Sequence, residues 1–247
     1  MNRELQDRVI LISGAGSGLG RATARRLAAG GATAVVGDID EAGAKETVRL
    51  VEAAGGAALA VRLDVTDPAS ARAAVCDSHE QFGDRFDGLV NNAGTDRGAS
   101  IVDLTDEQWQ QVISVNQSGP LYLTREFLKV IGTQDRAFPA DVVNVLSISA
   151  ITVGTDAAAY NSSKAALAML TRIMQREAHE YRWPVRIHGL MPSAMNTPMM
   201  EQWHLAEEVM MDPDTVARAV EFMITLPPDT FVQNLVINSR REPGWPR

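Results

Sequence analysis

Seven short runs of apolar residues, several of them β-branched, recur along the chain and are separated by segments long enough to form helices. The runs are apolar throughout instead of alternating with polar residues, which is typical of strands buried on both faces. Such strands occur in a parallel sheet that helices cover on each side. The sequence therefore predicts an α/β fold, a doubly wound Rossmann-type parallel sheet of about seven strands with helices on both faces.

The expected strands are 9–12, 34–36, 58–63, 88–90, 142–146, 185–190 and 235–237. The expected helices are 18–30, 41–54, 68–82, 106–131, 157–182 and 212–226, with Asp40, Asp67 and Thr105 as caps. The stretch 191–211 fits neither pattern, because it holds six of the ten methionines together with two prolines and Trp203. We expect it to form a mobile apolar lid.

Composition and charge exclude several classes of protein. An apolar share of 45% in 247 residues is enough for one domain with a sizeable core, so a single domain over 1–247 is expected. The net charge of −8 argues against a nucleic-acid partner, and no apolar stretch is long enough to cross a bilayer. A cytoplasmic protein with no membrane partner is expected.

Cysteine and histidine give no sign of metal chemistry. Cys76 is the only cysteine, which rules out an intrachain disulfide, and its place in a predicted helix suggests a small core residue. The four histidines are scattered without the spacing of metal ligands. No metal site is expected.

A glycine-rich turn that contains Gly14, Gly18 and Gly20 follows the first predicted strand. Glycines there let the backbone approach a pyrophosphate at the start of the next helix, where free N–H groups and the helix dipole attract anions. Asp38 ends the second predicted strand, where a carboxylate can accept hydrogen bonds from an adenosine ribose and repel a 2′-phosphate. No Arg or Lys stands at 37–40, so NAD(H) is favoured over NADP(H).

Tyr160 and Lys164 are four residues apart in a predicted helix, so they share one face. A cation beside a phenol lowers its pKa toward the range that is useful in acid–base catalysis. Ser147 has a hydroxyl that can hold a substrate oxygen beside the phenol. Together they predict a site that moves a proton on or off a carbinol or carbonyl.

Two further polar residues stand at informative places. Asp64 follows the third predicted strand, where an adenine edge can be met. Asn116 lies within a predicted helix, a poor place for asparagine unless its amide has a partner such as an active-site water.

In order and spacing these motifs resemble the short-chain dehydrogenase/reductase family in its standard-length, single-domain form, over residues 7–199. The resemblance implies that Ser147, Tyr160 and Lys164 are catalytic, and that Asn116 completes a tetrad through a water to the lysine. It also implies a set of cofactor-binding residues. They are Gly14, Ser17, Gly18, Leu19 and Gly20 at the pyrophosphate, Asp38 and Ile39 at the ribose, Asp64 and Val65 at the adenine, Asn91 over the adenosine-side ribose, Ala93 and Gly94 along the dinucleotide, Tyr160 and Lys164 at the nicotinamide ribose, and Pro192 and Thr197 at the nicotinamide.

The chain departs from the family pattern in two places. Where the family usually has Pro-Gly, this sequence has Pro192-Ser193, and serine restricts backbone torsions that glycine permits. The C-terminal tail, 239–247, lacks the usual Gly-rich turn and carries Trp245, which we expect to be free or packed on a neighbouring subunit. The resemblance implies a homodimer or homotetramer.

The expected activity is hydride transfer between NAD(H) and a secondary alcohol or ketone, with Tyr160 as the general acid or base. Two alternatives stay open: an NADPH-dependent ketoreductase of the 3-oxoacyl-thioester reductase type and a non-catalytic dinucleotide sensor. Segments 95–100, 149–155 and 191–211 are expected to line a pocket for a mainly apolar substrate. Arg97 is the one basic residue in these segments.

Overall fold

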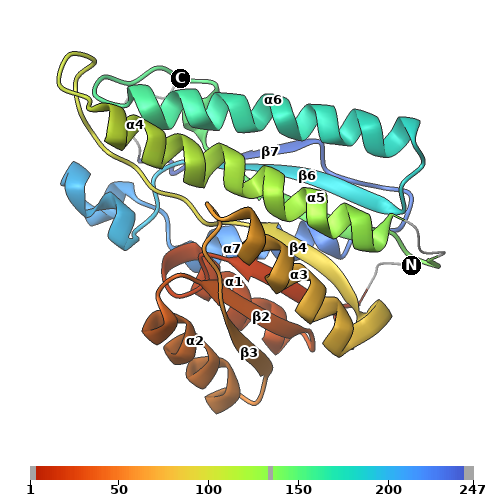
Figure 1. Ribbon diagram of the computed structural model, residues 1–247. Coiled ribbons are helices and arrows are strands. Elements are labelled where there is room, and N and C mark those ends of the chain that lie inside the picture. The colour runs from red at the N-terminus through yellow and green to blue at the C-terminus, as the bar shows by residue number, and fades with distance from the viewer. Residues whose placement is uncertain (1–3, 133–135, 242–247) are drawn as a thin grey trace.

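The computed structural model of the protein describes residues 4–132 and 136–241. Within these residues, seven parallel strands form one sheet in the order β3-β2-β1-β4-β5-β6-β7 (Figure 1). The strands are β1 (Val9–Ser13), β2 (Thr33–Asp38), β3 (Ala57–Arg62), β4 (Phe86–Asn91), β5 (Ala140–Val145), β6 (Val185–Pro192) and β7 (Asn234–Ile237). The strand order changes direction between β1 and β4, and open sheets of this kind bind ligands at the carboxyl ends of the strands beside such a change. The predicted doubly wound fold is confirmed.

Helices cover both faces of the sheet. In Figure 1, α1, α2 and α7 lie on one side, and α3, α5 and α6 lie on the other. The α-helices of the described residues are α1 (Gly18–Ala29), α2 (Glu41–Ala53), α3 (Pro68–Phe82), α4 (Asp106–Ile113), α5 (Gly119–Ile131), α6 (Ala158–Glu180) and α7 (Pro213–Ile224). Asp40, Asp67 and Thr105 accept hydrogen bonds from the first turns of α2, α3 and α4, as their positions predicted.

Two apolar cores result from the alternation of side chains along each strand. Ile10 and Ile12 of β1 pack with α1 and α7, where Val220 is fully buried. Val9 and Leu11 point to the opposite face and pack with Phe127 of α5. Because both sets are buried, the strand reads as a continuous apolar run, which is the pattern that predicted a covered parallel sheet.

The predicted helix 106–131 is interrupted at its centre. Between α4 and α5, residues Ser114–Ser118 form a π-helical turn, labelled η2, that contains Asn116. Pro120 explains the break, because proline has no N–H to donate to the carbonyl of Asn116 four residues earlier. Gly119 supplies room beside it, since a Cβ at that position would lie 2.9 Å from the Cβ of Val65.

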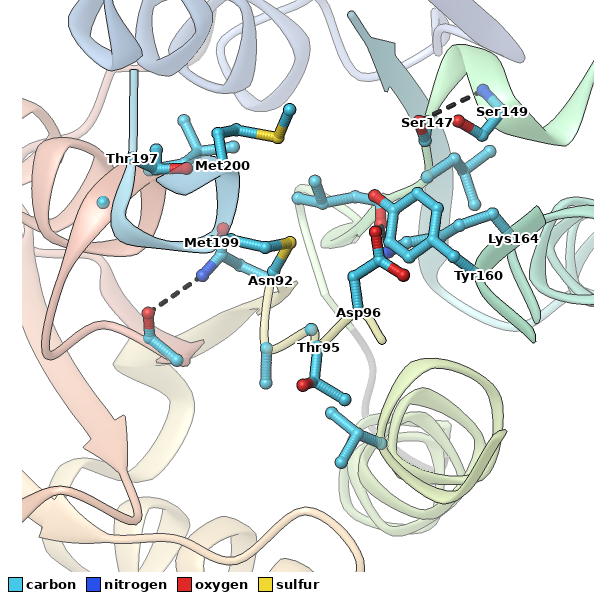
Figure 2. Close-up of a pocket in the computed structure, with 18 of the residues that line it drawn as sticks. Asn92, Thr95, Asp96, Ser147, Ser149, Tyr160, Lys164, Thr197, Met199 and Met200 are labelled. Atoms are coloured by element: carbon cyan, nitrogen blue, oxygen red, sulfur yellow. Dashed lines mark hydrogen bonds between the residues drawn. The ribbon is translucent and has the colours of Figure 1, made fainter. Parts of the chain in front are cut away.

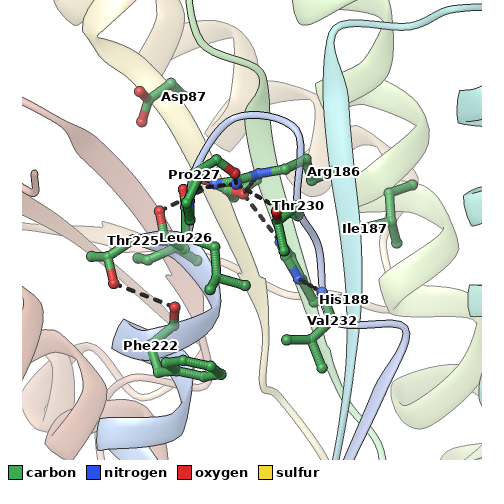
Figure 3. Close-up of polar contacts among 12 residues, drawn as sticks. Asp87, Arg186, Ile187, His188, Phe222, Thr225, Leu226, Pro227, Thr230 and Val232 are labelled. Atoms are coloured by element: carbon green, nitrogen blue, oxygen red, sulfur yellow. Dashed lines mark hydrogen bonds and ion pairs between the residues drawn. The ribbon is translucent and has the colours of Figure 1, made fainter. Parts of the chain in front are cut away.

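A buried ionic network ties the amino ends of the central strands together, and Figure 3 shows its part around Arg186 and His188. Asp141 of β5 accepts from Arg8 at 2.7 Å, from Arg186 of β6 at 2.8 Å and from the His188 ring at 3.1 Å. Arg8 also bonds Asp87 of β4 at 3.0 Å. Both guanidinium groups donate to the carbonyl of Ile224 at the end of α7. The network thus fixes α7 to four strands of the sheet.

His188 has a defined tautomer in this network. The backbone N–H of Val232 donates to Nδ1 at 3.1 Å, so Nδ1 is an acceptor and Nε2 carries the hydrogen that Asp141 accepts. Burial alone would raise the pKa of Asp141. The hydrogen bond from His188 and the charges of Arg8 and Arg186 outweigh this effect and lower the pKa to about 2.

Outside the site, the expectations for Cys76, for Trp245 and for membrane-spanning segments have different outcomes. Cys76 is exposed and is not a core residue, because Ala71, Ala74 and Val75 occupy the buried face of α3 and Cys76 is rotated away from it. Trp245 and the tail beyond Arg241 lie outside the described residues. Among the described helices, none combines the length and apolar character that crossing a membrane requires.

Candidate active site

A cavity of about 1350 Å³ opens at the carboxyl edge of the sheet and brings most of the predicted site residues together. It is larger than the 300–1,000 Å³ of ordinary small-molecule pockets, so it has room for a dinucleotide and a substrate. The predicted residues that line it are Gly14, Ser17, Gly18, Leu19, Asp38, Ile39, Asp64, Val65, Ala93, Gly94, Ser147, Tyr160, Lys164, Pro192 and Thr197. Gly20, Asn91 and Asn116 do not line it.

The glycine-rich turn joins β1 to α1 with left-handed backbone at Gly14 (φ +65°) and Gly18 (φ +50°). A Cβ on Gly14 would lie 2.7 Å from Cα of Ala93, so glycine is needed there for close approach as well as for torsion. Gly20 has a packing role instead, because its α-carbon lies against the Gly14 carbonyl and the Asn92 amide. The turn presents the N-terminus of α1 to the cavity, which suits a pyrophosphate.

Asp38 lines the cavity, and backbone N–H groups fix its carboxylate. Oδ2 accepts from Gly16 N–H at 2.8 Å and Oδ1 accepts from Asp40 N–H at 2.9 Å. A carboxylate has further lone pairs, so these bonds leave acceptor capacity for a ribose hydroxyl. Arg21 is a nearby cation, but its guanidinium is engaged by Thr47 and the Gly16 carbonyl and it does not line the cavity.

The two asparagines at the end of β4 point in opposite directions. Asn91 is buried inside the fold, where its amide donates to Thr124 at 2.9 Å and to Asn144 at 2.8 Å. The expected contact between the Asn91 side chain and a ribose is therefore not supported by its position. Asn92, which the sequence did not single out, lines the cavity and donates to the carbonyl oxygens of Ser13 and Gly14.

Asn116 does not line the cavity, but its side chain bonds the backbone of Thr95, which does. Its Oδ1 accepts from Thr95 N–H at 2.8 Å, and its Nδ2 donates to the Thr95 carbonyl at 2.8 Å and to Ser163 Oγ at 3.0 Å. The buried amide of Asn116 therefore has the hydrogen-bond partners that a helical asparagine needs. These partners are the protein groups of Thr95 and Ser163. Asn116 thereby holds the loop after β4 against α6.

Tyr160, Lys164 and Ser147 meet in the cavity as predicted (Figure 2). Ser147 follows β5 and accepts from Ser149 N–H at 3.1 Å, and its hydroxyl acts to lower the pKa of Tyr160. Lys164 lies one turn after Tyr160 on α6, but its Nζ donates to the Val145 carbonyl at 2.8 Å and is 5.7 Å from the centre of the phenol ring. The ammonium therefore lies beside the ring and makes its hydrogen bond elsewhere.

The acid–base balance of this group differs from the expected one. Burial raises the pKa of Tyr160 to about 12, against the lowering effect of the Ser147 hydrogen bond, and Asp96 raises it further. Burial also lowers the pKa of Lys164 to about 8, against the effect of Asp96. The pKa of Tyr160 is thus raised where a lowered one was expected, because desolvation by burial is the largest effect on the phenol.

Ser193 replaces the family glycine without strain. Its φ is outside the left-handed region, and its backbone N–H donates to the Ile237 carbonyl at 2.9 Å. Its hydroxyl accepts from Ser239 N–H at 3.1 Å. The loop after β6 is therefore fastened to the segment after β7, and its position does not depend on glycine.

Asp96 belongs to segment 95–100, which was expected to line the pocket, but the sequence assigned this residue no role of its own. It follows Gly94 by two residues, is 5% exposed and accepts from the indole N–H of Trp203 at 3.0 Å. A signal was present, because an acidic residue directly after the turn that closes β4 stands at the carboxyl edge of a central strand.

Comparison with known proteins identifies the family to which the chain belongs. A family model described as short chain dehydrogenase matches residues 8–208, so the chain belongs to the short-chain dehydrogenase family of oxidoreductases, which bind a nicotinamide dinucleotide.

Individual relatives differ in what they act on. The chain is 36% identical over 200 residues to 3beta-hydroxysteroid dehydrogenase 1 of Eggerthella lenta, covering 81% of this chain and 75% of the relative. It is 35% identical over 226 residues to levodione reductase of Leifsonia aquatica, covering 90% and 80%. Its fold matches the crystal structure of 3-ketoacyl-(acyl-carrier-protein) reductase from Brucella melitensis complexed with NADH, with a TM-score of 0.85, 29% identity and coverage of 96% and 99%.

Proposed function

We propose that the protein transfers hydride between NAD(H) and a secondary alcohol or ketone. The observation that carries the proposal is one cavity whose wall includes Tyr160, Ser147 and Asp38. The first pair provides a proton donor beside a hydroxyl that can hold a substrate oxygen. Asp38 disfavours a 2′-phosphate at the ribose, and Arg21 is engaged elsewhere, which supports NAD(H).

The chain's own residues handle the proton while the cofactor supplies or accepts the hydride. The Ser147 hydroxyl holds the substrate oxygen beside the phenol of Tyr160. In ketone reduction the neutral phenol donates its proton to that oxygen, and a pKa of about 12 keeps the phenol protonated at neutral pH. In alcohol oxidation the phenol must first lose its own proton, and the resulting phenolate of Tyr160 takes the hydroxyl proton of the alcohol. Lys164 supplies a donor for the nicotinamide ribose.

The substrate is proposed to be mainly apolar around the reacting carbon. The cavity wall includes Ile148, Val153, Met195, Met199 and Leu205. Thioether and aliphatic side chains of this kind adapt to apolar ligands. We also propose that the chain acts as one cytoplasmic domain and that segment 191–211 is a lid that moves on binding.

The first test compares NADH and NADPH as ligands of the purified protein by fluorescence titration, followed by turnover on a panel of secondary alcohols and ketones. Tighter binding of NADH and turnover that Tyr160→Phe lowers by about 10²- to 10⁴-fold are expected. Tyr160→Phe should still bind NADH, which separates loss of the proton donor from loss of the fold. Preference for NADPH would overturn the cofactor assignment.

Reduction of 3-oxoacyl thioesters is the second candidate function. The fold match to a 3-ketoacyl-(acyl-carrier-protein) reductase favours it. An acetoacetyl thioester in the panel distinguishes it, since this candidate predicts that the thioester is the best substrate. Cofactor binding without turnover of any panel member would point instead to a dinucleotide sensor.

We further propose that the protein is a homodimer or homotetramer. Leu121 of α5 and Met169 and Ile173 of α6 are exposed, and both helices cover the same face of the sheet. Apolar side chains gathered on the outside of helices are typical of subunit interfaces. Light scattering coupled to size-exclusion chromatography measures the mass directly, and a monomer would contradict the proposal.

A further inference from the structure

Asp96 is an acidic residue inside the cavity that the proton transfer described above does not use. It lies in the loop after β4, is 5% exposed and lines the cavity. In Figure 2 its carboxyl group points toward the ring of Tyr160 and the side chain of Lys164. Its negative charge also acts on both residues, because Asp96 raises the pKa of Tyr160 and of Lys164. Asp96 is therefore close to the reacting group.

The carboxyl group is held in one orientation by the lid. Oδ2 accepts from the indole N–H of Trp203 at 3.0 Å, and Trp203 ends the 3₁₀ helix η4 (Pro198–Trp203). The ring of Trp203 also packs against the loop, since a Cβ on Gly98 would lie 3.1 Å from it. These two contacts hold the loop that carries Asp96 against the lid.

The other carboxyl oxygen has no hydrogen-bond partner of normal geometry. Oδ1 is buried and unsatisfied. Leaving a buried acceptor without a donor costs free energy, so such atoms in native proteins commonly mark sites that a ligand completes. Burial raises the pKa of Asp96, and the hydrogen bond from Trp203, the backbone N–H of Arg97 and the charges of Arg97 and Lys164 act against this rise.

The missing partner must be a hydrogen-bond donor that enters the cavity. An ammonium group is disfavoured because Lys164, fully enclosed in the same cavity wall, would repel it. A neutral hydroxyl carries no such cost and forms a strong bond with an ionised carboxylate. The substrate oxygen held by Ser147 is already accounted for, so the donor is a second hydroxyl.

We propose that Asp96 is a specificity-determining residue whose Oδ1 accepts a hydrogen bond from a second substrate hydroxyl, so that vicinal diols and their hydroxyketones are preferred over simple alcohols and ketones. This inference rests on the proposed function. It adds that one polar contact lies in an otherwise apolar substrate pocket, and that Trp203 positions the residue that makes it.

The test uses two probes that differ by one hydroxyl, cyclohexanol and cyclohexane-1,2-diol. Binding of each to the protein–NADH complex is followed by fluorescence, and kcat/KM is measured for oxidation of each with NAD. Wild-type protein should favour the diol at least tenfold in both measurements. Asp96→Ala should remove that preference, and Asp96→Asn, whose amide oxygen still accepts, should keep part of it.

Asp103→Ala is the matched control, because Asp103 is an acid of the same loop that is exposed and does not line the cavity. It should keep the diol preference. Thermal unfolding of each variant checks that the fold is retained, and Asp96→Asn, which preserves the shape of the side chain, serves if the alanine variant does not fold.

Three outcomes would overturn the inference: equal binding of the two probes to wild-type protein, a diol preference that survives in Asp96→Ala, or a loss of NADH affinity in Asp96→Asn as large as the loss of diol affinity. The last would assign Oδ1 to a cofactor hydroxyl. Failure of the proposed function gives a different result. Diol binding would still depend on Asp96, but neither wild-type protein nor Tyr160→Phe would turn over the diol.

Discussion

Lys164 donates to the carbonyl oxygen of Val145, the last residue of β5, at 2.8 Å. The helical spacing of Tyr160 and Lys164 had suggested that the ammonium would instead face the phenol. Val145 is two residues before Ser147. One end of β5 therefore positions both the ammonium and the hydroxyl, and a shift of this strand end would move both groups together.

The first prediction concerns the pH dependence of ketone reduction. Lys164 has a pKa of about 8 and Tyr160 one of about 12, so the ammonium is lost first as the pH rises and the phenol stays protonated. The kcat for reduction at saturating NADH should decline through pH 8. Lys164→Arg stays charged in this range, and its residual activity should show no such decline. A decline at the same pH in both proteins would contradict the assignment.

Asp38→Ala should weaken NADH binding by about 10- to 100-fold, because a charged acceptor for the ribose hydroxyl is lost. NADPH should lose less, so the ratio of the two dissociation constants moves toward NADPH. Fluorescence titration of both cofactors measures the ratio. Asp40→Ala is the control, since Asp40 caps α2 and should change stability by about 1 kcal/mol while leaving the ratio as it was.

Gly20→Ala tests the packing of the glycine-rich turn. The added methyl group would meet the Gly14 carbonyl, and Cα of Ala15 at 2.8 Å, and these backbone atoms cannot move without distorting the turn. Urea unfolding should show a loss of about 1–3 kcal/mol. Gly154→Ala should be neutral, because no atom lies within 4 Å of its Cβ position and its φ is not left-handed. Equal effects of the two substitutions would refute this explanation.

Asp141→Asn should lower the free energy of unfolding by about 3–5 kcal/mol, because it leaves Arg186 buried without its carboxylate and leaves Arg8 with Asp87 alone. The folded pKa of Asp141, about 2, is below the unfolded value of about 3.9, so the stabilisation is present above pH 4 and is lost as the pH falls toward 2. Unfolding at several pH values should show a weaker acid dependence in the variant. The exposed pair of Glu46 and Arg49 offers a control, since Glu46→Gln should change little.

Asp96→Asn should stabilise the protein at neutral pH, opposite to Asp141→Asn. The folded pKa of Asp96 is raised, so stability is lost as the pH rises from the unfolded pKa through the folded one, and asparagine does not suffer this loss. We expect a gain of about 1 kcal/mol at pH 7 that shrinks as the pH approaches 4. Thermal unfolding across this range measures it, and a variant that is less stable at pH 7 would argue that Asp96 is a structural acid.

The sequence was sufficient where local rules decide the outcome. Continuous apolar runs predicted the strands, and Asp40, Asp67 and Thr105 predicted where three helices begin. The break in helix 106–131 was also predictable in principle, because Pro120 removes the donor for the Asn116 carbonyl.

Direction and burial of polar side chains required the three-dimensional structure. Asn91 and Asn92 are adjacent, and only the pleat and register of β4 decide that one faces Thr124 while the other faces the cavity. The pKa of Tyr160 depends on how much of the phenol the surrounding elements bury, which helical spacing does not reveal. Burial also distinguishes Asp96 from the other residues of its loop, and the sequence does not reveal that burial.

The buried ionic network described above joins the amino ends of the strands, whereas the cavity opens at their carboxyl ends. Fold maintenance and substrate choice are therefore assigned to opposite edges of one sheet. Substitutions in the loops that surround Asp96 and Trp203 leave the Arg8–Asp141–Arg186 anchorage intact, so natural drift or a directed-evolution library can explore new substrates there. The anchored edge supplies the mutational tolerance on which such exploration depends.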